Sequence, residues 1–290
     1  MSKPALALGF FDGVHLAHRA VLRRAREWAD THGCRALAVT FSVHPAAALT
    51  GAPQRLLQTL ADRVETLKTE CGMDDVIVLD FDRALQTTPW RDFVHDTLIG
   101  RLDAGFVAVG YDYRFGKGAE GDAEKLRDAL AAYGVETEIV PRMDDETGQA
   151  IGSRTLRALI ETGKPAQAAA MMGRPFSFAG EVLHGKSLGH KLGFPTMNVQ
   201  LPAELIIPAA GVYTAQLRIA GVLYGAVTNV SPAGLSESFV FDFSGDTYGQ
   251  IVRVYLLDYQ RPMRKFDSLE ALTEQVMSDR AEAQRRLAGI

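Results

Sequence analysis

Hydrophobic residues in the first half of the chain fall into short runs that alternate with segments of helical spacing. Five short runs, most of them apolar throughout, predict strands over residues 5–8, 36–41, 75–79, 106–109 and 135–140. Between these runs, apolar residues three and four apart predict helices over about 15–31, 62–71, 90–98 and 121–133. Apolar strands that alternate with helices are typical of a parallel sheet covered on both faces. We therefore expect an α/β domain.

The pattern changes after a helical segment over residues 156–172, which is interrupted around Gly163 and ends at Gly173. Beyond it, alternation with period two predicts strands over 178–183, 212–219, 222–230, 238–243 and 251–257. Short antiparallel strands at this spacing are typical of a small closed barrel. A final amphipathic helix is predicted over 268–287, with one apolar side formed by Leu269, Leu272, Val276 and Met277. We expect one domain over residues 1–172 and a second over 173–290.

Composition narrows the class of protein without choosing a function. The 290 residues carry a formal net charge of −4, with 47% hydrophobic and 23% charged residues, as in a soluble globular protein. There is no basic run, no apolar run near the roughly 18 residues of a membrane span, and no signal peptide at the start. Cys34 and Cys71 form no C-x-x-C pair, which favours reduced thiols. We expect a cytoplasmic protein with small-molecule partners and no nucleic acid or membrane partner, and self-association stays open.

The first candidate site is the stretch LALGFFDGVHLAHRAVL, which begins at Leu6. It predicts a strand, a turn with Gly9 and Asp12-Gly13, and a helix that opens with His15 and His18 on one face. The free N–H groups and positive dipole at a helix N-terminus suit phosphate. Two imidazoles there can hydrogen-bond a phosphate while charge builds in a transition state. Histidines three apart are by themselves more often surface residues, so the strand–turn–helix order is what favours a site.

Two further segments also follow predicted strands. His44 in TFSVHP is held extended by the proline after it, and a substrate contact and a plain strand-end histidine are equally compatible with this pattern. The segment GYDYRFGKGAEGD, from Gly110, combines glycines with Arg114, whose charge suits phosphate, and with aromatic rings that can stack on a ligand. Because the turns at Gly9, Phe41 and Gly110 each follow a strand, we expect them to line one crevice.

Two more segments carry polar residues at suggestive spacing. In IGSRTLR, Ser153 can cap a helix, and Arg157 lies one turn further, within reach of a phosphate. In GKSLGHKLGFPTMN, Lys191 can hold phosphates. Thr196 and Asn198 are two apart, so that an extended strand points both the same way. A hydroxyl and an amide side by side can bind Mg²⁺ and an ATP phosphate oxygen.

These segments resemble, in order, those of the bacterial bifunctional riboflavin kinase/FMN adenylyltransferase (FAD synthetase) family. The resemblance spans nearly the whole chain and rests on FDGVHLAH, TFSVHP, GYDYRFGKG, IGSRTLR, LGFPTMN and ESFVFDF, the last of which begins at Glu237. It implies a Rossmann-like nucleotidyltransferase domain followed by a small antiparallel β-barrel of the riboflavin kinase type. It also implies phosphorylation of riboflavin to FMN and adenylylation of FMN to FAD with release of pyrophosphate, using ATP and Mg²⁺.

The resemblance further implies roles for individual residues. His15 and His18 stabilise the α-phosphate transition state, Ser153 and Arg157 hold the β- and γ-phosphates, and Glu237 is the base for the riboflavin 5′-hydroxyl. The residues that it implies in nucleotide or flavin binding are Gly9, Phe11, Asp12, Gly13, His44, Asp112, Arg114, Phe115, Gly116, Lys191, Gly193, and Thr196 and Asn198, which also hold the metal.

The chain departs from the family pattern at several positions. Ala17 replaces the glycine between the two histidines, Phe10 replaces an asparagine, and Arg154-Thr155 stand in reverse order. The segment after Asn229 is also shorter. Two alternatives therefore stay open, a protein with only one of the two activities and a non-catalytic flavin sensor or carrier. An NAD-type oxidoreductase is disfavoured, because no G-x-G-x-x-G follows the first predicted strand.

Overall fold

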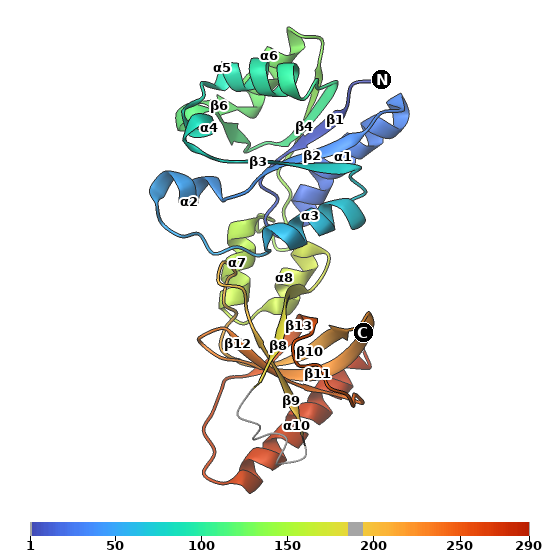
Figure 1. Cartoon of the computed structure of the whole chain (residues 1–290), viewed down its shortest axis with the longest axis vertical. Helices are drawn as coiled ribbons and strands as arrows, with labels where there is room; N and C mark the ends of the chain where they lie inside the picture. Colours follow the sequence, from blue (N-terminus) through green and yellow to red (C-terminus); the bar gives the residue numbers. More distant parts are fainter. Residues whose placement is uncertain (1, 185–193, 290) are drawn as a thin grey trace. The chain divides into compact units, whose positions relative to one another are not determined.

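The computed structural model describes residues 2–184 and 194–289 (Figure 1). Packing divides the chain into two compact units, Met1–Ser153 and Arg154–Ile290. This division precedes the boundary expected after residue 172, because α8 (Pro165–Met172) packs against strands of the second unit. The domain limits inferred from the sequence remain a prediction.

The first unit is built on a five-stranded parallel sheet with β1 at its centre. In spatial order its strands are β3 (Asp75–Leu79), β2 (Ala36–Phe41), β1 (Ala5–Leu8), β4 (Phe106–Gly110) and β7 (Glu136–Val140). All five predicted strands are confirmed, with ends within one residue. A separate two-stranded ribbon follows β4 and pairs β5 (Arg114–Phe115) with β6 (Gly121–Asp122).

Helices of the first unit connect these strands. Their bounds are α1 (Leu16–His32), α2 (Pro45–Thr50), α3 (Leu60–Thr69), α4 (Arg83–Thr87), α5 (Trp90–Asp92), η1 (Phe93–Arg101), η2 (Lys117–Ala119) and α6 (Ala123–Ala131). The single α-helix predicted over 90–98 is wrong in type. One α-helical turn, α5, passes directly into the wider π-helix η1. In this register Phe93, Val94 and Leu98 are all buried against the sheet.

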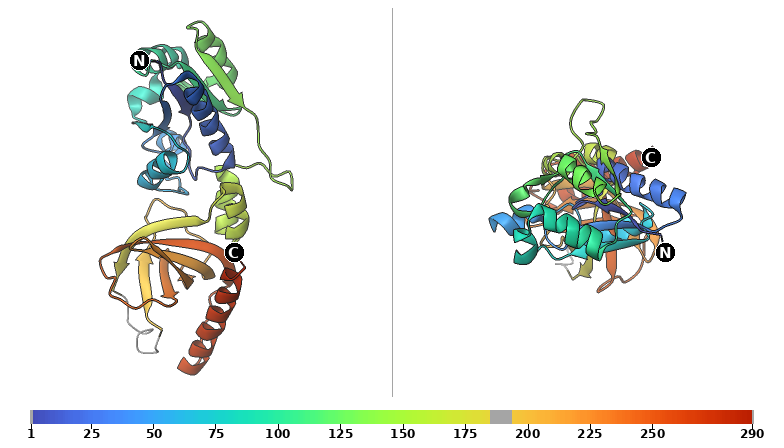
Figure 2. Two further views of the ribbon diagram at one scale, coloured as in Figure 1. Left: turned by 90° about the vertical axis from the view of Figure 1, so that its right-hand side faces the viewer. Right: turned by 90° about the horizontal axis from the view of Figure 1, so that it is seen from above.

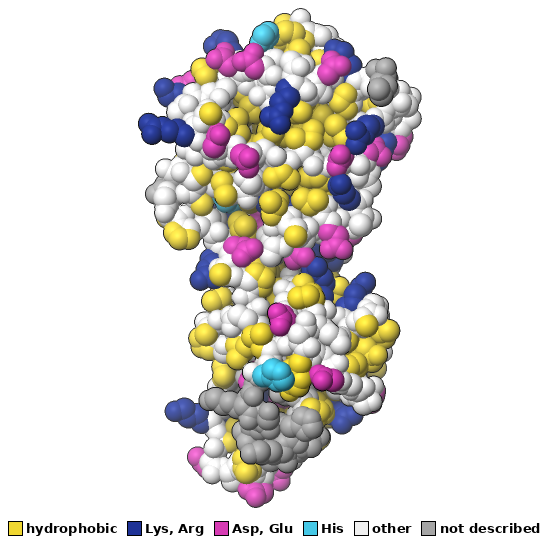
Figure 3. Space-filling model, in the orientation of Figure 1, with side chains coloured by type: hydrophobic (Ala, Val, Ile, Leu, Met, Phe, Trp, Pro, Cys, Tyr) yellow, Lys and Arg dark blue, Asp and Glu magenta, His cyan; other side chains and the backbone are white. Residues whose placement is uncertain are grey.

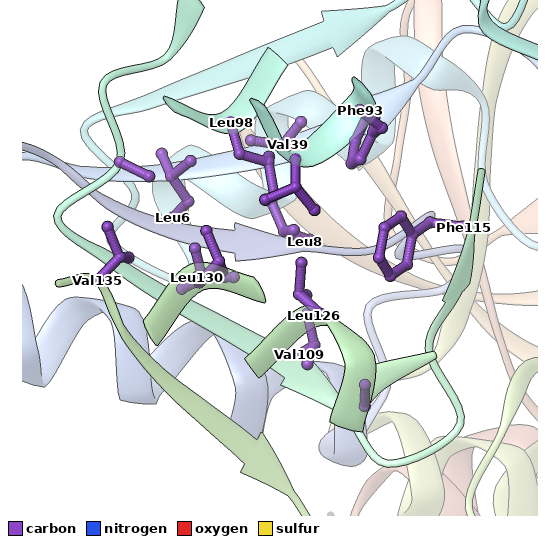
Figure 4. Close-up of a cluster of buried hydrophobic side chains, with 14 of the residues drawn as sticks. Leu6, Leu8, Val39, Phe93, Leu98, Val109, Phe115, Leu126, Leu130 and Val135 are labelled. Carbon is purple, nitrogen blue, oxygen red and sulfur yellow. The ribbon is translucent and has the colours of Figure 1, made fainter. Parts of the chain in front are cut away.

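The two faces of β1 carry side chains of different size. Leu6 and Leu8 point into a cluster of large side chains from η1, α6 and the neighbouring strands (Figure 4). Ala5 and Ala7 point to the opposite face, where α1 and α3 pack. Figure 2 shows α1 lying along this face. Small side chains let a helix approach a sheet closely, so the alanines bring the start of α1 close to the end of β1.

The second unit is a closed six-stranded barrel with a long helix against it (Figure 2). Its elements are α7 (Ser153–Glu161), α8, β8 (Phe176–Leu183), β9 (Thr196–Gln200), β10 (Gly211–Ile219), β11 (Val222–Val230), β12 (Leu235–Val240), β13 (Ile251–Arg261) and α10 (Leu269–Leu287). The strand order around the barrel is β10-β11-β12-β9-β8-β13. The predicted barrel and terminal helix are confirmed, and the segment 156–172 forms two helices that meet at its predicted break.

Two details of this unit correct the predictions. The strand expected over 238–243 is β12, three residues earlier, because Asp242 has a left-handed φ of 55° that ends the extended chain. On α10, Leu269 and Met277 are exposed rather than inward, whereas Asp279 and Ala283 are buried. The side of α10 that faces the barrel cavity carries Leu272, Val276 and Asp279, whereas Leu269 and Met277 do not line this cavity.

Candidate active sites

The first candidate site lies at the carboxyl edge of the parallel sheet, around the end of β1. The chain leaves β1 towards β2 and β3, and later crosses to β4 on the other side. Parallel sheets bind ligands at such a change of direction. The turns at Gly9, Phe41 and Gly110 follow the neighbouring strands β1, β2 and β4, so they share this edge as the sequence predicts.

The turn between β1 and α1 has an unusual backbone. Phe11, Gly13 and Val14 all have positive φ, at 58°, 83° and 41°. Such angles strain any residue except glycine, and strained backbone is often found at functional sites. A Cβ at Gly9 would lie 2.8 Å from the ring of Phe11. Two glycines of the predicted motif are therefore required by this turn itself.

Asp12 fixes the turn from inside the protein. Its side chain is buried, and Oδ1 accepts the backbone N–H groups of Leu57 at 2.9 Å and Gln58 at 3.3 Å. The Ser153 hydroxyl donates to the Asp12 carbonyl oxygen at 2.9 Å. Ser153, which is distant in sequence, is thus brought to the turn that leads into α1. In this structure Asp12 positions the turn and does not face solvent.

His15 and His18 form a stacked pair at the start of α1. His15 caps the helix, its Nδ1 accepts the His18 backbone N–H at 3.2 Å, and the ring centroids are 3.5 Å apart. Burial lowers the pKa of His15 from 6.5 to about 4. Burial also holds the pKa of His18 well below its usual value, with smaller contributions from His15 and Arg63. Both rings are therefore neutral at pH 7, and His15, whose Nδ1 is an acceptor, offers an Nε2–H donor.

His44 stands beside this turn. It caps α2 with Nδ1 accepting the Ala46 backbone N–H at 3.1 Å, and its backbone is extended as predicted. Its ring meets the ring of Phe10 edge-on, with the centroids 4.6 Å apart. A capping role therefore accounts for Nδ1, and a contact with a ligand stays a prediction.

The segment after β4 divides into exposed and buried parts. Asp112 and Arg114 are exposed at the end of β4, and Arg114 lies 3.6 Å from the carboxylate that caps α6. Phe115 is only 7% exposed and packs in the hydrophobic core, and its contact with a ligand stays a prediction. Gly116 has φ of 73°, and a Cβ there would lie 2.5 Å from the Cα of Trp90. The packing of Phe115 and Gly116 therefore explains why these residues follow Arg114.

Arg63 is a residue of this site that the sequence prediction missed. Its side chain is fully buried, Nη2 donates to the Phe41 carbonyl oxygen at 2.6 Å, and Cζ lies 4.1 Å from the centroid of the Phe10 ring. Burial lowers its pKa to about 10, while Asp12 opposes this effect. Arg63 lies one turn before the apolar Leu67 in the helix predicted over 62–71, so an arginine on the apolar side of that helix was the signal in the sequence.

The second candidate site is a cavity of about 860 Å³ in the barrel unit. Thr196 and Asn198 on β9 and Glu237 on β12 all line it, as the sequence predicts for one site. Pairing between strands places Glu237 opposite Asn198 and opposite Asn229 on β11. The Asn229 Oδ1 is buried without a hydrogen-bond partner among the described residues. Asn229 was not predicted, because its place beside Glu237 depends on the pairing of β11 with β12.

The remaining lining of the cavity is largely apolar and includes an ion pair. Its apolar lining includes Val182, Phe194, Met263, Phe266, Leu272 and Val276. Arg261 on β13 binds Asp279 on α10 through two bonds of 2.9 and 2.6 Å. This pair ties α10 to the barrel and so fixes the wall that α10 contributes. An apolar slot with a few polar groups is typical of a site for a flat organic ligand.

Several predicted residues are not joined to either site by these contacts. Lys191 and Gly193 lie outside the described residues. Arg157 is half-buried on α7 in the second unit. Arg154 before it is exposed and Thr155 is half-buried. The role of Arg157 towards phosphate stays a prediction.

The charged side chains seen on one face of the molecule form no large patch of one sign. Figure 3 shows basic and acidic side chains interspersed over the face in view. Among residues 2–184 and 194–289, no group of three or more His, Cys, Asp and Glu side chains is arranged to hold a metal ion. Within the same residues, no helix has the length and apolar character needed to cross a membrane.

Comparison with known proteins agrees with this two-unit architecture. Residues 1–155 match the FAD synthetase family model, and residues 172–287 match the riboflavin kinase family model. Among solved structures, one titled as a macrolide-efflux protein from Streptococcus pneumoniae superposes with a TM-score of 0.87 and 31% identity, covering 98% of this chain and 95% of its own.

Curated relatives extend over almost the whole chain. The bifunctional riboflavin kinase/FMN adenylyltransferase of Escherichia coli (strain K12) is 33% identical, covering 96% of this chain and 91% of its own. The protein of the same name from Pseudomonas fluorescens is 34% identical, covering 95% and 90%. That from Bacillus subtilis (strain 168) is 29% identical, covering 100% and 94%. With both family models matched in order and such relatives matched end to end, the chain belongs to the bifunctional riboflavin kinase/FMN adenylyltransferase family.

Proposed function

We propose that the chain makes FAD from riboflavin in two ATP-dependent steps, one in each unit. The barrel unit phosphorylates riboflavin to FMN, and the parallel-sheet unit adenylylates FMN and releases pyrophosphate. The observation that carries the proposal is the stacked, neutral histidine pair at the start of α1, at the edge where the sheet changes direction. This arrangement suits a phosphate. Capping of α1 accounts for His15 alone and does not require a second histidine at position 18.

In the adenylylation step, a phosphate oxygen of FMN attacks the α-phosphorus of ATP, and the bond to the bridging oxygen breaks. His15 and His18 donate N–H hydrogen bonds to the α-phosphate and its leaving oxygen, where negative charge increases. We assign Ser153 and Arg157 to the β- and γ-phosphates that leave. The protein forms no covalent bond, so its contribution is positioning and electrostatic stabilisation.

In the kinase step, the riboflavin 5′-hydroxyl attacks the γ-phosphorus of ATP, and ADP leaves. Glu237 takes the hydroxyl proton, as a carboxylate within a phosphate-transfer site does in other kinases. The apolar wall of the cavity holds the flavin ring, and Asn198, opposite Glu237, lies beside the reacting groups. Asn229, with its buried and unpartnered Oδ1, accepts a hydrogen bond from the substrate.

Mg²⁺ fits the donor set of this second cavity. Thr196 and Asn198 offer hydroxyl and amide oxygens on the same side of β9, and Mg²⁺ prefers oxygen ligands, with ATP phosphates completing its shell. When bound, Mg²⁺ neutralises charge on the ATP phosphate oxygens. We assign both residues to this task.

The test resolves the flavins formed when the purified protein is incubated with riboflavin, ATP and Mg²⁺. We expect FAD from the wild-type chain, FMN alone from His18→Ala, and unchanged riboflavin from Glu237→Gln. The second variant should still convert added FMN to FAD, which shows that its first unit is folded. Absence of both products from the wild-type chain, with flavin still bound, would replace this proposal with a flavin carrier.

A further inference from the structure

The reaction proposed above assigns no role to Arg63, although it is among the largest fully buried side chains that the structure describes. Two of its guanidinium nitrogens, Nε and Nη1, have no hydrogen-bond partner among the described residues. A buried cation with unpaired donors destabilises a fold, so its presence needs an explanation. Groups of this kind are concentrated at functional sites.

The contacts of Arg63 join the two strand ends that carry histidines. Its Nη2 donates to the carbonyl oxygen of Phe41, the last residue of β2, three residues before His44. Its guanidinium also stacks over the ring of Phe10, in the turn that leads to His15. One side chain thus contacts both segments at the carboxyl edge of the sheet.

The charge of Arg63 acts on the histidine pair. The titratable and charged groups that face His18 are His15 on α1 itself and Arg63 on α3, while Asp12 in the turn faces Arg63. A neighbouring cation disfavours a second positive charge, so Arg63 adds to burial in keeping His18 neutral. The Nδ1 of His18 is itself buried without a partner among the described residues.

We propose that Arg63 is a positioning residue for adenylyl transfer. Its guanidinium ties the end of β2 to the β1–α1 turn and places a permanent positive charge behind His18. This inference rests on the proposed function of the first unit.

The proposal explains why a costly side chain is tolerated at this position. A neutral His18 keeps a ring N–H for hydrogen bonding, and a fixed cation behind it adds to the positive potential met by the α-phosphate. Because the cation is buried, the potential is screened little by water or salt. Arg63 itself touches no reacting atom and acts through the histidines.

The test compares Arg63→Met, which removes the charge but fills the space, with Arg63→Lys, which keeps the charge but loses the planar fork. Lys68→Met is the control, because it removes an exposed positive charge from the same helix. FAD formation from FMN is measured against pH, and riboflavin phosphorylation by the same sample gives the amount of active chain. Thermal unfolding of each variant shows whether the first unit is folded.

For Arg63→Met we expect kcat to fall about tenfold to a hundredfold, with KM for ATP changed less than about threefold, as for loss of positioning and electrostatic support. The acid limb of its pH profile should move to higher pH. Arg63→Lys should keep the acid limb and lose a smaller part of kcat, and Lys68→Met should match the wild type. A folded Arg63→Met with the wild-type kcat and pH profile overturns the proposal. If that variant does not fold, a wild-type kcat in Arg63→Lys overturns it.

A measurement that needs no turnover separates this inference from the proposed function. NMR titration of the chain's histidines, with His18 assigned from His18→Gln, gives the pKa of His18 directly. We expect it to rise in Arg63→Met and to stay low in Arg63→Lys. An unchanged pKa in Arg63→Met overturns the role of Arg63 whether or not the wild-type chain forms FAD. Failure of the wild-type chain alone to form FAD counts against the proposed function.

Discussion

Burial of His15 predicts a loss of stability in the first unit as pH falls. The folded-state pKa is about 4 instead of 6.5, and the side chain is only 4% exposed. Well above pH 6.5 the His15 ring is neutral in both the folded and the unfolded state, so its titration does not reduce the free energy of unfolding. Between pH 6.5 and 4 the unfolded chain binds a proton that the folded chain does not, and unfolding is favoured. The difference of about 2.5 in pKa corresponds to about 3 kcal/mol lost by pH 4.

The two tryptophans of the chain, Trp28 and Trp90, both lie in the first unit, so their fluorescence follows its unfolding in urea without interference from the barrel. His15→Gln cannot titrate, so its unfolding free energy should fall between pH 7 and pH 4 by about 3 kcal/mol less than that of the wild type. His95→Gln, at an exposed histidine, should behave as the wild type. Equal losses in His15→Gln and the wild type would refute a buried neutral His15.

Three further predictions follow from single contacts. Asp279→Ala leaves Arg261 unpaired in the cavity wall and should cost the barrel about 3–5 kcal/mol of unfolding free energy, measured by calorimetry; a loss below about 1 kcal/mol would contradict this. Gly9→Ala places a methyl group 2.8 Å from the Phe11 ring and should lower FAD formation from FMN at least about tenfold, while riboflavin phosphorylation is unchanged; equal loss of both activities would mean a general folding defect. Asn229→Leu removes the buried acceptor and should reduce kcat/KM for riboflavin phosphorylation about tenfold without changing adenylylation of FMN, and an unchanged value would exclude Asn229 from substrate binding.

Periodicity predicted the fold well because burial on both faces of a parallel sheet leaves a strong local signal. Most strands of the parallel sheet are apolar runs, and their short lengths distinguish these runs from helices. The π-helix after Trp90 has no such signal, since its hydrogen bonds differ from those of an α-helix by one residue and the buried positions Phe93, Val94 and Leu98 suit both forms. The left-handed backbone of Asp242, just after β12, is likewise a feature of one residue that hydrophobic periodicity does not indicate.

The site residues also differ in how far local sequence could predict them. His15 and His18 could be predicted because both lie on one short helical segment whose spacing is visible in the chain. The helical spacing pointed only to a buried arginine at position 63, and neither the contacts of Arg63 nor the place of Asn229 could be predicted, because both depend on packing or pairing between distant segments. Burial of Phe115 in the core could not be predicted either, since a motif that contains exposed residues also contains residues that support them.

The open sheet of the first unit and the closed barrel of the second differ in their exposure to association with other chains. Closure leaves the barrel's strands paired on both sides, whereas β3 and β7 each present one unpaired row of backbone groups. Both edge strands carry charged side chains that disfavour pairing with another strand, Asp75 on β3 and Glu136 and Glu138 on β7. Association with another chain through strand pairing is therefore expected at the edges of the parallel sheet, where these charges oppose it, and not at the closed barrel.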